Sequence, residues 1–154
     1  MADDQDLATL AREIIDTNLY MTLGTADAAG RPWASPVYYA FDGYREFFWV
    51  SAPESTHSRN LTERPELGIV IFDSTVPINT GRGVYMTAVA EELTGPDREP
   101  GIDIFSARSL GTGGEEWTLA DVEAPAPLRL YRAIASDHSV IRPLIPRTPV
   151  SLID

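Results

Sequence analysis

The sequence contains no cysteine and no lysine, and these two absences narrow the chemistry that the chain can perform. Without cysteine there is no disulfide, no thiolate zinc site, no iron–sulfur cluster and no thiol nucleophile. All 12 basic residues are arginine. A lysine Schiff base to pyridoxal phosphate and the lysine of a P-loop are therefore excluded as well.

Positive charge is also scarce relative to negative charge. The 12 basic residues stand against 23 acidic ones, for a formal net charge of −11. Nucleic acid and anionic membrane surfaces repel such a chain, so we expect neither as a partner. No apolar run approaches the roughly 18 residues of a membrane span, and Met1–Asp4 lack the basic region of a signal peptide. We therefore predict a cytoplasmic location.

Length and composition fit one globular domain. The chain has 154 residues, of which 44% are hydrophobic and 23% charged, and this is enough to bury a core. We predict a single domain over residues 1–154. Residues 142–154 contain three prolines and are expected to form a C-terminal arm rather than a core element.

The hydrophobic periodicity predicts a mainly β fold. Helices are expected at residues 7–15, 58–63 and 97–110. Strands are expected at residues 19–24, 33–41, 46–51, 67–72, 83–94 and 128–134. The first three strands fit an antiparallel meander. About six antiparallel strands with a few short helices predict a small, Greek-key-like barrel.

Several candidate sites have ordinary structural interpretations. The glycines at 111–114 are expected to end a helix, because no strand precedes them as a phosphate loop requires. Residues 115–127 are acidic and contain proline, as surface loops do. The two histidines, His57 and His138, have no metal-ligand spacing, so no metal site is predicted.

The segment 55–60 combines three hydroxyls, an imidazole and a guanidinium at the start of a short helix. The free N–H groups of a helix start attract anions, so the segment fits a phosphate-binding site. The alternative is a helix cap with a solvated arginine. Tyr38, Tyr39 and the aromatic run 47–49 are likewise either a stacking platform for a flat cofactor or ordinary strand residues.

An ordered series of short motifs makes the sequence resemble the flavin-binding split-barrel proteins related to pyridoxamine 5′-phosphate oxidase. The resemblance runs from Leu19 to Leu93 and, more loosely, through residues 128–134. The motifs, in order, are Tyr20-Met-Thr-Leu-Gly-Thr25, Gly30-Arg-Pro32, Ser35-Pro-Val-Tyr38, Phe48-Trp-Val-Ser51, Ser55-x-His57-x-Arg59-Asn60-Leu61, Pro65, and Arg82-Gly-Val84 opening a strand that ends Ala90-Glu-Glu92.

The resemblance implies a homodimer of split barrels with a flavin phosphate cofactor in each of two clefts at the interface. By this resemblance Ser35, Pro36, Val37 and Tyr38 lie beside the isoalloxazine ring, and Val50 and Ser51 offer main-chain groups to it. The residues that correspond to the phosphate site are Ser55, Thr56, His57 and Arg59. Arg82 and Gly83 correspond to contacts from the partner subunit.

Two departures from the family pattern affect the expected cofactor and substrate. His57 stands where the family usually has lysine or arginine, and its charge is not fixed at pH 7. The cofactor implied by the resemblance is therefore FMN or, alternatively, a deazaflavin coenzyme in the same cleft. The C-terminal segment 148–154 lacks the arginine motif of true pyridoxamine phosphate oxidases, so vitamin oxidation is not predicted.

The leading functional hypothesis is a flavin- or deazaflavin-dependent oxidoreductase acting on a small, flat substrate, with no side chain required as an acid or base. The alternative is a non-catalytic protein that binds a flavin, deazaflavin or haem as a carrier, sensor or stress protein. A homodimer is also expected from the strand at 83–94, which is apolar on both faces. One chain has too few helices to cover both.

Overall fold

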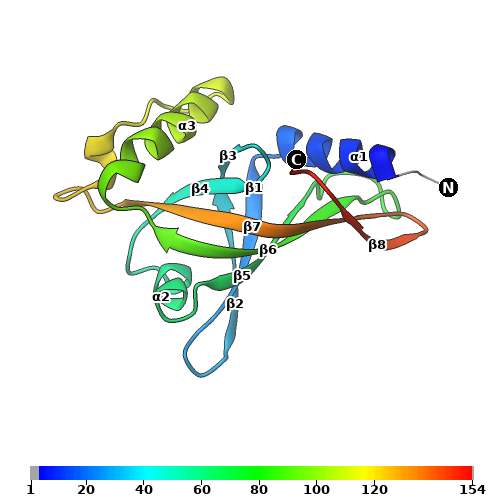
Figure 1. The fold of residues 1–154 in the computed structure, drawn as a ribbon, viewed down its shortest axis with the longest axis horizontal. Helices are drawn as coiled ribbons and strands as arrows, with labels where there is room; N and C mark the ends of the chain where they lie inside the picture. Colours follow the sequence, from blue (N-terminus) through cyan, green and yellow to red (C-terminus); the bar gives the residue numbers. More distant parts are fainter. Residues whose placement is uncertain (1–3, 154) are drawn as a thin grey trace.

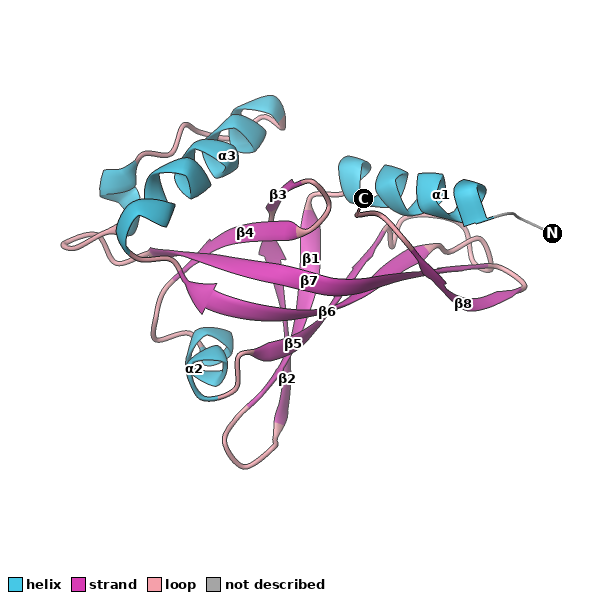
Figure 2. Ribbon diagram, viewed as in Figure 1, coloured by secondary structure: helices cyan, strands magenta, loops and turns pink. Residues whose placement is uncertain are grey.

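The computed structural model describes residues 4–153 as one curled antiparallel sheet with helices at its ends (Figures 1 and 2). The helices are α1 (Asp4–Thr17), α2 (Thr56–Glu63) and α3 (Arg98–Gly111), with short 3-10 turns η1 (Gly95–Asp97) and η2 (Leu119–Val122). The strands are β1 (Tyr20–Ala26), β2 (Pro32–Tyr38), β3 (Ala40–Asp42), β4 (Glu46–Ser51), β5 (Glu66–Phe72), β6 (Gly83–Glu92), β7 (Arg129–Arg142) and β8 (Ile145–Val150).

Helix α1 forms as its periodicity predicts. The apolar residues at helical spacing are all buried against the barrel: Leu7, Leu10, Ala11, Ile14 and Ile15. A single apolar stripe of this kind gives a helix one face to bury. Its burial seats α1 over one end of the sheet (Figure 1).

The strand order shows how the barrel closes. The strands run β2-β1-β5-β6-β7-β4-β3, and every pairing is antiparallel. The two ends of this order, β2 and β3, are separated along the chain by Tyr39 alone. Both edges of the sheet therefore start from one residue, and the sheet curls around a core. The predicted mainly β barrel is confirmed, with eight strands rather than about six.

One detail of the predicted meander is wrong. The strand expected at 33–41 is broken at Tyr39, because its first part pairs with β1 and its last part with β4. Strand β4 pairs with β7 on its other side. Periodicity reports which face of a strand is apolar, whereas the partner of a strand depends on residues far away in the sequence.

The C-terminal half of the chain also differs from the prediction. The strand expected at 128–134 continues to Arg142, passing a bulge in its ladder with β6 between Thr87 and Ala88. The segment expected to be an arm contains β8, which pairs with the last part of β7. Its prolines, Pro146 and Pro149, are tolerated because β8 has β7 as its single partner, and proline fits an edge strand.

Helix α3 packs on the outside of the barrel through a second apolar cluster. This cluster joins Ile102 and Phe105 to Phe48 and Leu130 of the sheet. Arg108, in the last turn of α3, donates from Nη2 to the carbonyl oxygen of Asn18 at 2.8 Å. It also donates from Nε to the carbonyl of Tyr39 at 3.2 Å. These contacts fix α3 beside the point where the barrel closes.

A buried histidine ties β7 to the β3–β4 turn. His138 is 4% exposed, and its Nε2–H donates to the carbonyl oxygen of Tyr44 at 2.6 Å. Burial lowers the pKa of His138 below its usual range, although the Tyr44 carbonyl and Asp137 act in the opposite direction. The ring is therefore neutral at pH 7.

This burial predicts that acid destabilises the fold through His138. Above about pH 6.5 the ring is neutral in both the folded and the unfolded chain, so it adds no pH dependence. As pH falls below that value the unfolded chain takes up the proton first, and stability is lost until the lower folded pKa is passed. We expect urea unfolding of His138→Gln to lose less stability between pH 8 and pH 5.5 than the wild type. An equal loss in both proteins would contradict this.

Candidate functional site

A cleft opens between the sheet and the end of α3. Its volume is about 650 Å³, within the usual range of small-molecule sites. Six residues singled out in the sequence line it: Pro36, Val37 and Tyr38 from β2, Val50 and Ser51 from β4, and His57 from α2. The structure thus brings together residues that are more than 20 positions apart in the chain.

His57 is held at the edge of this cleft by three serine hydroxyls. Its Nδ1 lies 3.0 Å from Oγ of Ser35. Its Nε2 lies 2.9 Å from Oγ of Ser51 and 3.3 Å from Oγ of Ser55. Both ring nitrogens therefore have hydroxyl partners, and β2, β4 and α2 are joined at one imidazole. We refer to Ser35, Ser51, Ser55 and His57 as the imidazole–serine cluster.

The cluster is electrically neutral at pH 7. His57 is 8% exposed, and burial lowers its pKa below the usual range with no contribution from a neighbouring charge. Hydroxyls and imidazole can both donate hydrogen bonds, and the cluster contains no carboxylate to repel an anion. It can thus bind a phosphate or a carbonyl oxygen.

Ser55 does not cap α2 in the expected way. It occupies the N-cap position, but its side chain makes no capping hydrogen bond to the helix backbone. Its Oγ lies instead 2.7 Å from Oγ of Ser58 and 2.9 Å from the carbonyl oxygen of Ala52. The hydroxyl therefore contacts Ala52, Ser58 and His57 and leaves the backbone N–H groups of the helix start uncapped by this side chain.

Aromatic rings form one wall of the cleft. The Tyr38 ring centroid is 5.6 Å from that of Phe105, which is in turn 5.4 Å from that of Trp117. Tyr20 lies 6.2 Å from Tyr38 on the other side. Such a wall suits a flat, conjugated ligand. The run 47–49, by contrast, is buried in the two cores and takes no part in the cleft.

The contribution of α3 and the loop after it could not be recognised in the sequence. The glycines at 111–114 do end α3, as predicted, but Thr112, Gly113 and Gly114 also line the cleft. Residues 115–127, expected to be a surface loop, place Trp117 in the cleft wall. A tryptophan in an otherwise acidic loop was the only sequence signal of this role.

This loop is fixed against α3 by buried serines. Oγ of Ser109 donates to the carbonyl of Glu115 at 2.7 Å, and the backbone N–H of Trp117 donates to Oγ of Ser106 at 2.8 Å. A Cβ on Gly114 would lie 2.5 Å from Oγ of Ser109 and 3.2 Å from its carbonyl oxygen, so a larger residue would displace the hydroxyl that holds Glu115. The wall of the cleft is therefore preformed.

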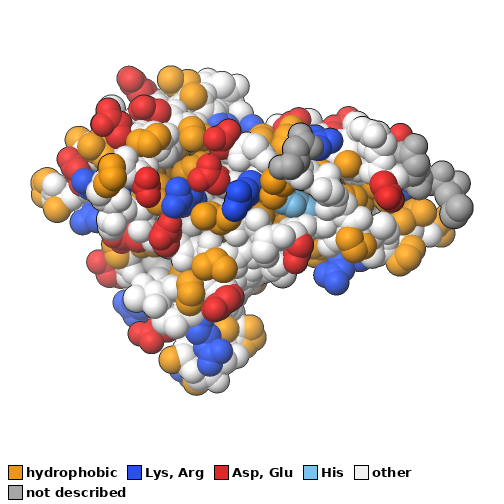
Figure 3. Space-filling model, viewed as in Figure 1, with side chains coloured by type: hydrophobic (Ala, Val, Ile, Leu, Met, Phe, Trp, Pro, Cys, Tyr) orange, Lys and Arg blue, Asp and Glu red, His pale blue; other side chains and the backbone are white. Residues whose placement is uncertain are grey.

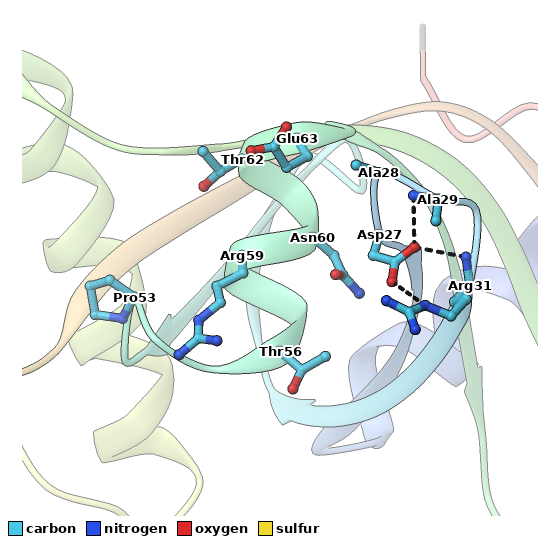
Figure 4. A pocket seen from close by; sticks show the side chains of 10 residues that line it. All are labelled: Asp27, Ala28, Ala29, Arg31, Pro53, Thr56, Arg59, Asn60, Thr62 and Glu63. Atoms are coloured by element: carbon cyan, nitrogen blue, oxygen red, sulfur yellow. Dashed lines mark hydrogen bonds and ion pairs between the residues drawn. The ribbon is translucent and has the colours of Figure 1, made fainter.

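Arg59 lies on the opposite side of α2 from His57. With Thr56 it lines a separate cavity of about 700 Å³ beside the β1–β2 turn, and it extends toward Pro53 (Figure 4). Within residues 4–153 its guanidinium makes no ion pair with a carboxylate. Each helical residue adds about 100° of rotation, so residues two apart point in nearly opposite directions. The structure thus separates two residues that the sequence interpretation grouped.

Arg82 and Gly83 line neither cavity. They lie at the start of β6, at the opposite end of that strand from α2 (Figure 1). Nη1 of Arg82 is 3.8 Å from Oε2 of Glu13 in α1. Within one chain these two residues therefore stand apart from the other candidate residues.

The outer face of the sheet is uncovered around β1, β2, β5 and β6. Trp33 is 50% exposed and Val89 is 53% exposed. A hollow of about 890 Å³ lies between them. Gly24 and Gly68 lie opposite each other in this region, and a Cβ on Gly68 would meet no atom within 4 Å. No atom of this chain occupies the space beside Gly68, so the hollow has room for part of another molecule.

Comparison with protein families finds one match over most of the chain. The model described as pyridoxamine 5′-phosphate oxidase matches residues 7–134. No curated protein matches the sequence. Within residues 4–153 no helix is long and apolar enough to cross a bilayer.

Solved structures with the same fold carry different descriptions. A heme binding protein from Mycobacterium smegmatis has a TM-score of 0.72 at 17% identity; the alignment covers 99% of this chain and 59% of that protein. HutZ, the heme storage protein of Vibrio cholerae, has a TM-score of 0.69 at 18% identity; the alignment covers 88% of this chain and 94% of HutZ. A structure described as F420 reductase has a TM-score of 0.62 at 16% identity; the alignment covers 84% of this chain and 95% of that protein. These similarities establish the split-barrel fold and leave the ligand open.

Proposed function

Because the chain belongs to the pyridoxamine 5′-phosphate oxidase family, we propose that it binds FMN in the His57 cleft and acts as an oxidoreductase on a small, flat substrate. One observation carries the proposal. The aromatic wall of Tyr38, Phe105 and Trp117 lines the same cleft as two members of the imidazole–serine cluster, Ser51 and His57, and Ser35 and Ser55 contact that imidazole from behind the lining. The wall suits a planar ring, and the cluster suits a phosphate.

The chain's own residues have defined tasks in this proposal. Ser35, Ser51, Ser55 and His57 would hold the phosphate by hydrogen bonds, while Tyr38 and Phe105 would orient the ring and exclude water from one side. Phosphate is dianionic at neutral pH, so its arrival favours the protonated imidazole and His57 takes up a proton. The bound flavin supplies hydride transfer, and no side chain of the cleft is required as a proton donor.

A deazaflavin and haem are the competing ligands. A deazaflavin has a similar flat ring, and one solved structure of this fold is described as F420 reductase. Two others are described as heme-binding or heme-storing proteins. Iron or a phosphate would each have to displace a serine hydroxyl from a nitrogen of His57. A displaced hydroxyl can donate to a phosphate oxygen, whereas iron offers it no acceptor, so the cluster favours a ligand that carries a phosphate over haem.

Direct titration tests the cofactor. The purified protein, freed of bound small molecules, is titrated separately with FMN, a deazaflavin and haem, with absorbance and fluorescence as readouts. We expect saturable binding of FMN with quenching of its fluorescence. If the deazaflavin binds more tightly than FMN, the deazaflavin is the cofactor and FMN is not. If haem alone binds, the proposal is overturned.

Turnover separates the enzyme from a non-catalytic flavin carrier or sensor. Quinones, enones and nitro compounds are each added to the protein loaded with reduced cofactor under anaerobic conditions. Reoxidation faster than with free cofactor supports the oxidoreductase. A rate equal to that of free cofactor with every compound would favour the carrier or sensor.

The proposal includes a homodimer in which a second copy covers the outer face of β1, β2, β5 and β6. Its support is the exposure of Trp33 and Val89 and the hollow between them, since a monomer rarely leaves such a patch bare. Arg82 and Gly83 would then be offered to the partner's cleft. A monomer in sedimentation at micromolar concentration would contradict the dimer. The cytoplasmic location stays a prediction.

A further inference from the structure

The two sides of the His57 cleft differ in charge. The sheet side carries the imidazole–serine cluster, which is neutral at pH 7. The other side is formed by the end of α3 and the loop that follows it, where Thr112, Gly113, Gly114 and Glu115 line the cleft. Glu115 is exposed, and it is the one acidic residue among the described residues that line this cleft. The α3 side of the cleft is therefore negative.

No positive side chain offsets this charge. In the part of the chain that the structure describes, no arginine lines the cleft. Arg108 and Arg129 each adjoin a lining residue in the sequence, but both are held by backbone carbonyls. Arg108 donates to the two carbonyls described above, and Nη1 of Arg129 lies 2.6 Å from the carbonyl oxygens of Ala126 and Leu128. Among residues 4–153 Glu115 takes part in no ion pair, so its charge is not neutralised by another side chain.

The end of α3 adds to this negative charge. The carbonyl end of a helix carries a partial negative charge, whose effect is confined to about the last turn. Ser109 lies in the last turn of α3 and Thr112 is its C-cap, and both line the cleft. The surrounding segment is acidic as well, because residues 97–123 contain seven acidic residues and two arginines. Acidic side chains gather over α3 and the loops beside it (Figure 3). An anion that enters from this side is therefore repelled, and a cation is attracted.

The aromatic wall of the cleft is also suited to a cation. The faces of tryptophan, tyrosine and phenylalanine rings attract ammonium and guanidinium groups, most strongly where water is excluded. The rings of Phe105 and Trp117 meet edge to face at 80°, with their centroids 5.4 Å apart, so their faces point in different directions. Trp117 follows Glu115 by two residues in the same loop, which Ser106 and Ser109 fix to α3. A carboxylate and aromatic faces on one side of a cleft are the combination that recognises an organic cation.

We propose that the substrate of this cleft is a flat aromatic compound that carries a cationic nitrogen, such as an ammonium or amidinium group, and that Glu115 receives this cation. The inference rests on the proposed function, which places the cofactor phosphate at the imidazole–serine cluster and so leaves the α3 side for the substrate. The ring of the substrate packs against the aromatic wall, and its cation lies beside Glu115. Compounds with a carboxylate or a phosphate in that position are repelled.

Three probes that share one nitroaromatic ring and differ in charge test this inference. At pH 7 para-nitrobenzylamine is cationic, para-nitrobenzyl alcohol is neutral and para-nitrobenzoate is anionic. Calorimetry measures the binding of each probe to the full chain, both loaded with FMN and free of cofactor. We expect the amine to bind about three- to tenfold more tightly than the alcohol, and the benzoate to bind most weakly. High salt should reduce the difference between the amine and the alcohol, because Glu115 is exposed and its charge is screened.

Two variants of the loop locate the charge that the amine contacts. Glu115→Gln removes the charge and keeps the size of the side chain, so the amine and the alcohol should then bind with affinities within about twofold of each other. Glu116→Gln is the matched control, because it removes the same charge from the neighbouring position, which does not line the cleft. This control should keep the preference for the amine. An equal loss of preference in both variants would assign the effect to the overall charge of the loop and overturn the contact with Glu115.

The outcomes separate this inference from the proposed cofactor. If FMN binds and the amine binds no more tightly than the alcohol or the benzoate, the inference is overturned and the cofactor stands. The inference is also overturned if none of the three probes binds to either form of the protein. If FMN does not bind but the amine is preferred and Glu115→Gln removes that preference, the cation site stands, and its role as a substrate site falls with the proposed function.

Discussion

His57→Ala is expected to weaken FMN binding by about ten- to hundredfold. A hydrogen bond to a charged group contributes about 1.5–3 kcal/mol, and about 1.4 kcal/mol corresponds to a factor of ten in affinity. The substitution also removes the shared partner of Ser35, Ser51 and Ser55, whose hydroxyls then lose their fixed orientation. Fluorescence titration with FMN measures the effect.

Arg59→Ala is the matched control from the same helix. Its guanidinium lines the separate cavity beside the β1–β2 turn, so we expect its FMN affinity to stay within about threefold of the wild type. The sequence interpretation placed both residues at the phosphate. If Arg59→Ala loses more affinity than His57→Ala, the phosphate lies in the Arg59 cavity rather than in the imidazole–serine cluster.

The pH dependence gives a second readout of the same site. The ring of His57 is neutral at pH 7 in the free protein, because burial lowers its pKa. Binding of a dianion raises that pKa, so binding takes up a proton and affinity should increase as the pH falls from 8 to about 6.5. Above that value phosphate, with a second pKa of about 6, remains largely dianionic.

Riboflavin and His57→Ala are the controls for this dependence. Riboflavin has the ring without the phosphate, so its affinity should not change over the same range. The variant lacks the titrating imidazole and should show a flat profile with FMN. An equal increase in affinity for FMN and riboflavin would assign the pH effect to the ring and contradict the phosphate site.

Tyr39→Ala is expected to lower the free energy of unfolding by about 3–5 kcal/mol. Tyr39 is the residue at which the two edges of the sheet meet, and its side chain is fully buried in the barrel core. Its hydroxyl donates to the carbonyl oxygen of Ile15, in the last turn of α1, at 2.6 Å. Removal of the ring leaves a cavity and an unpaired carbonyl together. Urea unfolding monitored by circular dichroism measures the change.

Two further variants test the cause of that loss. Tyr39→Phe removes the hydroxyl alone and should lower the free energy of unfolding by about 1–2 kcal/mol. This variant keeps the prediction testable if the alanine variant does not fold. Tyr20→Ala truncates a tyrosine that is 61% exposed and should change stability by less than about 1 kcal/mol. Equal losses at Tyr20 and Tyr39 would refute the structural role of Tyr39.

Features that depend only on residues close together in the sequence could be predicted from it. The stripe from Leu7 to Ile15 predicts α1, the apolar run at 67–72 predicts β5, and the glycines at 111–114 end α3. Each is set by a local pattern of burial or backbone freedom. The order of motifs also predicted the family, which the match over residues 7–134 confirms.

Part of the site could have been read more closely from the sequence. A helix over residues 58–63 was expected, and α2 begins two residues earlier, at Thr56. Within any helix the side chains at 57 and 59 point in nearly opposite directions, because residues two apart do not share a face. The structure accordingly places His57 and Arg59 in different cavities, and their joint assignment to one phosphate stays a prediction that the two alanine variants test.

What the sequence by itself determined is the fold class, the family and the local elements, because these follow from composition, periodicity and short motifs. Only the tertiary structure decided the break at Tyr39, the pairing of β8 with β7, and the cleft in which Trp117 faces β2. These features join residues far apart in the chain. Pairing over such distances is decided by the burial of whole faces and the entropy of closing long loops, which no local pattern reports.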